Sequence, residues 1–247
     1  MKTLDKEAIK QFVLKNPQYY NYSIKEAKLR TGLDTNDITE LNKFYIDAYE
    51  PLNEEEFKVL AKYIKEADEK VKKIVSRVGL QDKNIEWKFI KMKKGTDWNF
   101  PNTKADVIIL PQSAFKEPKQ LFNTLVHEKL HIYQRKFPKV FTKYYADKYQ
   151  FKPLILNDEQ LESISELNIE DIIVNNPDTT DMGLMIFRNQ IIPIPVIIEG
   201  RQYPVLAGLY VKGNKIMFTT DMLKYQKIFN VAQTDHPNEI FACKFAY

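Results

Sequence analysis

The strongest constraint on this chain is an H-E-x-x-H motif that begins at His127 and ends at His131. On an α-helix, residues four apart project from one face, so both imidazoles can point at the same metal ion. Glu128 lies about 100° round the helix axis and can face a water molecule bound to that metal. Apolar residues around the motif predict a largely buried helix over about residues 117–136. The fold must bury this helix and bring a further ligand to it.

The first third of the chain predicts mostly helices. Residues 1–50 contain three short candidates, at about 5–15, 24–31 and 36–48. Asn53 and Glu56 then form a capping box at the start of a long amphipathic helix. Its apolar stripe needs a sheet or another helix to cover it.

Strands follow in two groups. Residues 85–89 alternate between apolar and polar side chains, which predicts a half-buried strand. The continuous apolar run 106–110 predicts a strand covered on both faces. After a helix at about 139–149, residues 183–220 are rich in short β-forming runs, and a last helix begins at Pro237. This distribution of helices and strands predicts an α+β fold.

Pro51 and the capping signal after it mark the best domain boundary. The sequence therefore predicts a helical N-terminal extension, residues 1–50, followed by a second unit, residues 51–247. Residues 22–44 have the rhythm of a helix-turn-helix. An ordinary helical hairpin is the simpler interpretation, because two short helices joined at a glycine are common and the acidic residues there would weaken phosphate binding.

Composition excludes several classes of protein. A single cysteine, Cys243, excludes a disulfide framework and a cysteine-rich zinc site. The net charge of +4 is spread among acidic residues, so nucleic acid is not the expected partner. No apolar run approaches the ~18 residues of a membrane span, and Asp5 and Glu7 stand where a signal peptide needs an apolar core. We expect a soluble cytoplasmic or intracellular protein without a membrane partner.

A catalytic zinc needs a third protein ligand and one position open to water. No histidine follows His131 closely, so this ligand must come from farther along the chain. Glu239 is the favoured candidate, because Pro237 can open a helix and place Glu239 in its first turn. The same carboxylate could instead act as a helix cap, and His236 could be the ligand. The remaining rivals are carboxylates of a polar region: Glu166, Glu170, Asp171 and Asp181.

These residues resemble those of the zincin metallopeptidases, and within them the glutamate-ligand branch, the gluzincins. The resemblance rests on the H-E-x-x-H motif and on Asn238-Glu239. The order of elements from about residue 52 is also similar to a zincin catalytic domain: a backing helix, a mixed sheet with an edge strand, the active-site helix and the glutamate helix. The runs TLVHEKLHIYQR and HPNEIFA resemble, more faintly, small metallopeptidase-like proteins encoded by large DNA viruses.

The resemblance implies a zinc-dependent peptidase with one zinc ion per chain. His127, His131 and Glu239 would be the metal ligands, and Glu128 would be the general base that takes the proton of water. The sequence departs from the gluzincin pattern at Cys243, where the family often has an aspartate that orients the first histidine. A thiol is a weak acceptor, so another group would have to orient His127.

The resemblance also implies how a substrate would bind. A peptide or protein substrate would pair with an edge strand, for which residues 106–110 are the candidate. A hydrogen-bond donor should stabilise the developing oxyanion, and Tyr203 and His236 are favoured over Tyr210 for this role.

Two other classes of function stay open. One is a catalytically silent, zincin-like binding protein that holds zinc structurally or not at all, although an intact Glu128 argues against it. The other is a regulator whose residues 1–50, possessing the helix-turn-helix rhythm, bind DNA or another partner.

Overall fold

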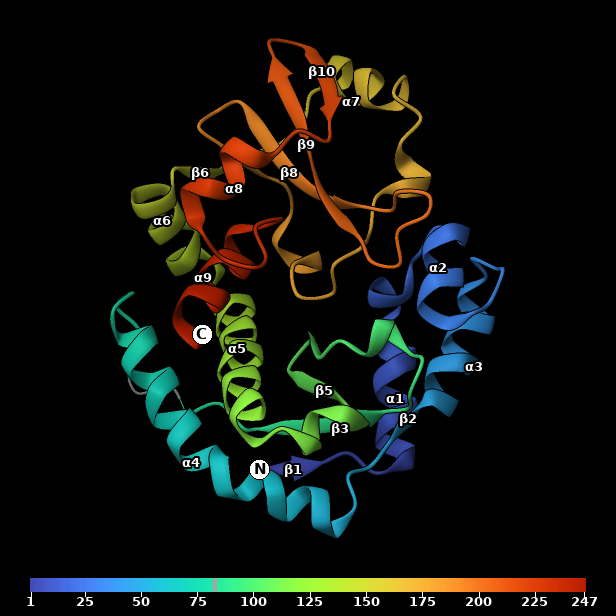
Figure 1. Cartoon of the computed structure of the whole chain (residues 1–247), viewed down its shortest axis with the longest axis vertical. Coiled ribbons are helices and arrows are strands. Elements are labelled where there is room, and N and C mark those ends of the chain that lie inside the picture. Colours follow the sequence, from blue (N-terminus) through green and yellow to red (C-terminus); the bar gives the residue numbers. More distant parts are fainter. Residues whose placement is uncertain (82–83) are drawn as a thin grey trace.

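The structure is a computed structural model that describes residues 1–81 and 84–247. It confirms the α+β class: within these residues the strands form two sheets, and helices pack around both (Figure 1). One sheet is mixed and lies near the N-terminus. The other is antiparallel and is built from the second half of the chain.

The mixed sheet has the order β1-β3-β5-β4, with β2 also paired to β3. Strands β1 and β5 run parallel to β3, whereas β2 and β4 run antiparallel to their partners. The run 106–110, expected to form an edge strand, contributes instead to an internal strand, β5 (Val107–Pro111), and the edge strand on that side is β4. The strands are β1 (Lys2–Thr3), β2 (Tyr49–Glu50), β3 (Lys88–Met92), β4 (Asn102–Lys104) and β5 (Val107–Pro111).

Two long helices cover one face of the mixed sheet. Phe89, Ile108 and Leu110 point into the core that they share with these helices. The predicted capping box is present, because the side chain of Asn53 accepts the N–H of Glu56 and the carboxylate of Glu56 accepts the N–H of Asn53. The helices are α4 (Glu54–Ser76) and α5 (Pro118–Lys136), and α5 carries the H-E-x-x-H motif.

The N-terminal helices cover the opposite face, so the sheet is the middle layer of three. Alternate residues Ile90, Met92, Val107 and Ile109 pack into a second core there. The expectation that the apolar run 106–110 is covered on both sides is thereby confirmed. The helices on this side are α1 (Lys6–Lys15), α2 (Ile24–Thr31) and α3 (Ile38–Ala48).

This arrangement corrects the predicted division of the chain at Pro51. Residues 1–50 supply two strands, β1 and β2, that pair with β3. They also supply the layer that buries one face of the sheet. The sequence signals at Pro51 mark the start of a helix, but the units on either side share one sheet and its core.

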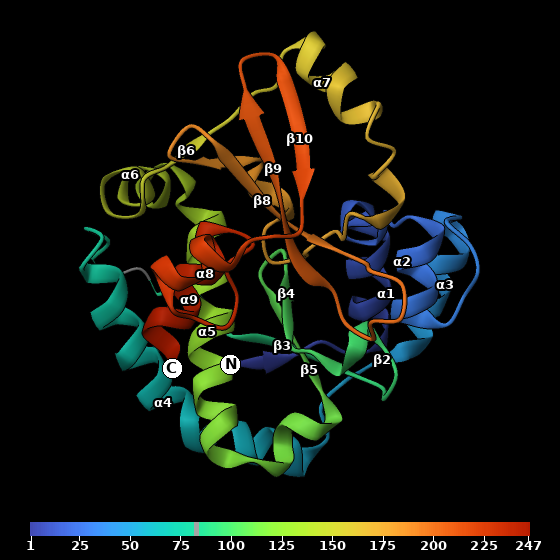
Figure 2. The ribbon, with the colours of Figure 1, turned by 45° about the horizontal axis from the view of Figure 1, so that its top comes forward.

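The antiparallel sheet has the order β10-β9-β8-β7-β6 and packs its own small core with α7. Helix α9 returns to lie against α5, as two views show (Figures 1 and 2). No helix in the described part of the chain is long and apolar enough to cross a membrane. The elements are β6 (Phe151–Pro153), β7 (Met185–Phe187), β8 (Ile191–Val196), β9 (Val205–Lys212), β10 (Lys215–Thr219), α6 (Pro138–Tyr149), α7 (Asp158–Ser165), α8 (Leu223–Phe229) and α9 (Pro237–Ala246).

The shared core can be tested with two leucines of the N-terminal part. Leu41 is fully buried in the second core, whereas Leu14 is 47% exposed. Leu41→Ala should lower the free energy of unfolding by about 2–5 kcal/mol, and Leu14→Ala by no more than about 0.5 kcal/mol. Denaturant titration with and without zinc would measure both. If the unfolding transition that zinc shifts has the same denaturant midpoint in Leu41→Ala as in the unaltered protein, residues 1–50 fold separately.

Candidate metal centre

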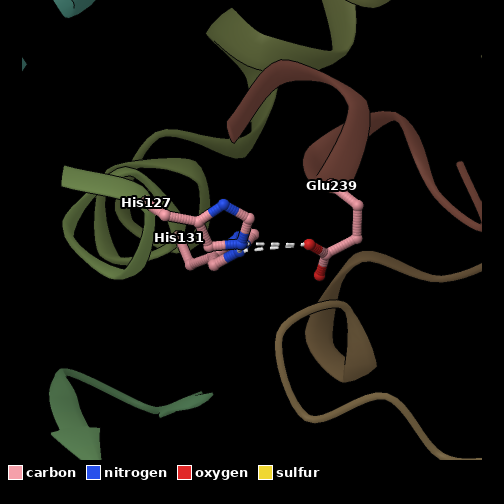
Figure 3. A group of neighbouring side chains, drawn as sticks. All are labelled: His127, His131 and Glu239. Carbon is pink, nitrogen blue, oxygen red and sulfur yellow. Dashed lines mark hydrogen bonds and ion pairs between the residues drawn. The ribbon is translucent and has the colours of Figure 1, made fainter. Parts of the chain in front are cut away.

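Helices α5 and α9, far apart in the chain, bring three potential metal ligands together (Figure 3). The Nε2 atoms of His127 and His131 lie 2.9 Å apart. Glu239 Oε2 lies 3.2 Å from the first of these nitrogens and 3.5 Å from the second. The three residues predicted as ligands from the sequence are therefore the ones that the fold brings together.

These distances fit a tetrahedral zinc site. With metal–ligand bonds of about 2.0–2.1 Å, two ligand atoms of a regular tetrahedron lie about 3.3 Å apart. The observed sides of the triangle scatter around that value. Glu239 Oε2 is buried and makes no hydrogen bond to the described residues. An acceptor in that position, facing two ring nitrogens, is suited to a cation.

The hydrogen bonds of Gln134 determine which ring nitrogen of His131 carries the proton and which is available to bind a metal. Gln134 Nε2 donates to the carbonyl oxygen of Asn238 at 3.1 Å, and this oxygen can only accept. Gln134 Oε1 must therefore be the atom 2.7 Å from His131 Nδ1, and that nitrogen must carry a proton. In the neutral ring, the lone pair is then on Nε2, which faces Glu239 and His127.

Tyr145 connects Gln134 on α5 to Asn238 on α9. The hydroxyl of Tyr145, on α6, accepts a hydrogen bond from Gln134 Nε2 at 3.0 Å and donates one to Asn238 Oδ1 at 2.9 Å. Asn238 directly precedes Glu239. The network therefore holds α5, α6 and α9 in one arrangement around the ligands.

His127 lacks a comparable support. Its Nδ1 is buried and has no hydrogen-bond partner among the described residues. Cys243, which stands where the gluzincin pattern often has an aspartate, donates instead to Gln233 Oε1 at 3.6 Å. The departure noted in the sequence therefore leaves the first histidine without an orienting acceptor within the described structure.

Glu239 is a ligand candidate and does not cap its helix. The residue that caps α9 is His236, whose Nδ1 accepts the N–H of Asn238 at 3.1 Å. Glu239 lies in the first turn, as predicted, and its Oε1 accepts a hydrogen bond from Asn176 Nδ2 at 3.1 Å. Its second oxygen faces the imidazoles.

The electrostatics of the cluster favour a positive charge. Burial alone would lower the pKa of His131, but the carboxylates of Glu239, Asp178 and Glu128 raise it to about 10. Burial would likewise raise the pKa of Glu239, yet the two imidazoles hold it well below its ordinary value. A divalent cation bound by these groups would replace the proton that His131 otherwise attracts.

Glu128 is placed beside the cluster and touches the edge strand. It is 3% exposed, and its Oε2 accepts a hydrogen bond from Thr103 Oγ1 at 2.7 Å. Burial, and then the neighbouring Asp178, raise the pKa of Glu128 well above its ordinary value. Glu128, His131 and Asp178 also form a second group of acidic and imidazole side chains close enough to contact one ion.

The other candidates from the sequence lie in different surroundings. Tyr203 is 45% exposed, and its ring packs on Phe100, which precedes β4. His236 is buried, and burial lowers its pKa to about 4, so its ring is neutral. With Nδ1 accepting, the proton of His236 is on Nε2, and the backbone of Gly183 favours that proton. None of the rival carboxylates belongs to a metal-ligating group in the described chain: Glu166, Glu170, Asp171 and Asp181.

Four residues near the ligands were not found from the sequence: Thr103, Gln134, Asn176 and Asp178. Only Gln134 had a readable signal, because it follows His131 by three residues and shares its helix face. The others lie in a strand or a loop that only the tertiary fold brings to α5.

Comparison of the chain with protein-family models, with curated proteins and with solved structures finds no match. The function of the protein is therefore inferred from the geometry of this cluster.

Gln134 provides a test of the metal centre that leaves all three ligands in place. Gln134→Leu should weaken zinc binding about 10–100-fold, because the acceptor that holds the proton on His131 Nδ1 is lost. Gln134→Glu keeps an acceptor oxygen and should retain more of the affinity. Competition with a chromogenic chelator would measure both, and equal affinity in Gln134→Leu and the unaltered protein would contradict the assignment.

Proposed function

We propose that the protein is a zinc-dependent peptidase with a zincin-like active site. The observation that carries the proposal is the triangle of ligand atoms from His127, His131 and Glu239, with Glu128 next to it on the same helix. Two imidazoles and one carboxylate are the donor set of catalytic zinc sites that leave one position for water.

In this proposal Glu128 is the general base. A bound zinc ion would lower the pKa of water at the centre towards ~7 and polarise the peptide carbonyl. The carboxylate of Glu128 accepts the proton of that water and later delivers it to the leaving amine. The hydrogen bond from Thr103 holds one carboxylate oxygen of Glu128, and the other oxygen would take the proton.

The substrate in this proposal is an extended peptide beside β4. That strand forms the sheet edge next to α5, and Thr103 connects it directly to Glu128. Main-chain pairing with such an edge is a common way to hold an unfolded polypeptide. His236 is the better candidate than Tyr203 for the oxyanion donor, because its neutral ring is buried and lies near the charge of Glu239, whereas Tyr203 is 45% exposed.

One observation favours the alternative of a silent zinc-binding protein. His127 is 6% exposed, and His131 and Glu239 are fully buried, so the cluster has little access to solvent. A structural zinc site is closed in this way, whereas a catalytic one keeps an open position. Hydrolysis that depends on Glu128 separates these two functions.

Glu128→Gln should abolish peptide hydrolysis while zinc content and melting temperature stay close to those of the unaltered protein. Glutamine keeps the shape of the side chain but cannot take a proton from water. Cleavage of a fluorogenic peptide mixture, with zinc measured by mass spectrometry, would test this. Substantial turnover by Glu128→Gln would remove Glu128 from the proposed role.

Glu239→Ala should lose metal-linked stability. In excess chelator, its melting temperature should lie near that of the unaltered protein. In free zinc about 1,000-fold above the dissociation constant, the unaltered protein gains roughly 4 kcal/mol that the variant lacks. The matched control is Glu170→Ala, which removes an exposed carboxylate outside the cluster. A difference between Glu239→Ala and the unaltered protein that is the same with and without zinc would exclude Glu239 as a ligand.

A further inference from the structure

The outer edge of β4, where a peptide would pair, is already occupied by another part of the chain. In an antiparallel strand, backbone groups alternate between the partner strand and the free side. Thr103 faces the free side: its N–H donates to Asp178 Oδ1 at 2.7 Å, and its carbonyl oxygen accepts from Arg135 Nη2 at 2.7 Å. These are the two groups that an added strand would use.

The neighbouring outward positions are closed as well. Pro101 has no N–H to offer. The carbonyl oxygen of Ala105 accepts a hydrogen bond from Arg135 Nη1 at 3.2 Å. Strand addition to residues 101–105 would therefore have to replace contacts that the chain makes with itself.

Two parts of the chain occupy this edge: Arg135 of α5, and Asp178, which belongs to the segment of residues 175–181. Arg135 Nη2 also donates to the carbonyl oxygen of Pro177, so one guanidinium joins the segment to β4. At the other end of the cluster, Asn176 Nδ2 donates to Glu239 Oε1 at 3.1 Å. The segment thus runs from a metal ligand to the edge strand.

Residues of the N-terminal part hold the outer side of the same segment. Arg30 Nη2 donates to the carbonyl oxygen of Asn175 at 2.7 Å, and Glu26 Oε1 accepts the N–H of Asn175 at 3.0 Å. The hydroxyl of Tyr19 donates to Asp181, which also pairs with Arg135 at 3.0 Å. Residues 1–50 therefore support the segment as well as the sheet.

We propose that residues 175–181 are an internal blocking segment, which occupies the binding position of an extended peptide on β4 and must leave it before a substrate can bind. This inference rests on the proposed peptidase function. It accounts for the burial of all three ligands in a site that needs an open position. The segment also has space next to it, because a groove of about 490 Å³ is lined in part by Asn175, Asn176, Thr179 and Thr180.

The blocking segment should weaken peptide binding in proportion to the fraction of closed molecules. If the edge is free in only about 1% of molecules, the apparent dissociation constant rises about 100-fold. A variant that releases the segment should lower the apparent dissociation constant again, although the peptide makes the same contacts once it is bound. Release should also let a chelator reach the zinc faster.

Two variants release the segment at different points. Asp178→Ala frees the N–H of Thr103 but also removes a charge close to His131 and Glu128. Asp181→Ala removes the outer contacts to Arg135 and Tyr19 and lies outside both metal-ligating groups. A purely electrostatic effect on the zinc would therefore appear only in Asp178→Ala. Asp171→Ala, at an exposed position before the segment, is the matched control.

The probe is a fluorescent tripeptide hydroxamate added to zinc-loaded protein. Both release variants should bind it at least tenfold more tightly and transfer zinc to a chromogenic chelator faster, whereas Asp171→Ala should match the unaltered protein. The amide of Thr103 should also exchange its hydrogen at least tenfold faster in both release variants. Equal hydroxamate affinity in all four proteins, including none in any of them, would overturn the blocking segment.

The same measurements separate this inference from the proposed function. If the release variants bind the hydroxamate more tightly but no protein hydrolyses peptides, the blocking segment is supported and the peptidase function is contradicted. If all four proteins hydrolyse peptides at the same rate, the peptidase function is supported and the blocking segment is contradicted. If the protein holds no zinc, the proposed function fails, and the exchange of the Thr103 amide alone decides whether the segment closes the edge.

Discussion

Negative charge buried next to two imidazoles is the constraint on which this structure depends. Glu128, Asp178 and Glu239 are all less than a tenth exposed, and one oxygen of Glu239 faces His127 and His131 without a hydrogen bond among the described residues. Burying carboxylates is costly unless a positive charge is nearby. A divalent cation held by these groups would offset that cost at the point where α5 and α9 meet.

The sequence predicted the parts of the site whose geometry is local. His127 and His131 share one face as soon as their segment forms a helix. Glu239 lies in the first turn as soon as a helix begins at Pro237. Asp178 and Thr103 could not be found in this way, because nothing near them in the chain indicates which helix they will face. No such local constraint applies to Tyr203, whose half-exposed ring packs on Phe100.

The pattern of the sheet also argues against a domain boundary at Pro51. The apolar run 106–110 predicted a strand covered on both faces, and the helices after Pro51 could cover only one of them. The cover for Val107 and Ile109 had to come from elsewhere, and residues 1–50 were the remaining helical part. Their role extends further, because Arg30 and Tyr19 also hold the loop that closes the edge of β4. Residues 1–50 therefore contact both the second core and the segment that lies between β4 and the candidate metal ligands.

X-ray absorption spectroscopy of the zinc-loaded protein tests the metal centre most directly. The spectrum should show a first shell of nitrogen and oxygen only, at about 2.0–2.1 Å, with the outer-shell scattering of two imidazole rings. Glu239→Ala should alter that shell, and Glu170→Ala should leave it unchanged. A sulfur ligand at about 2.3 Å, which only Cys243 or a methionine could supply, or a shell without imidazole scattering, would contradict the central claim.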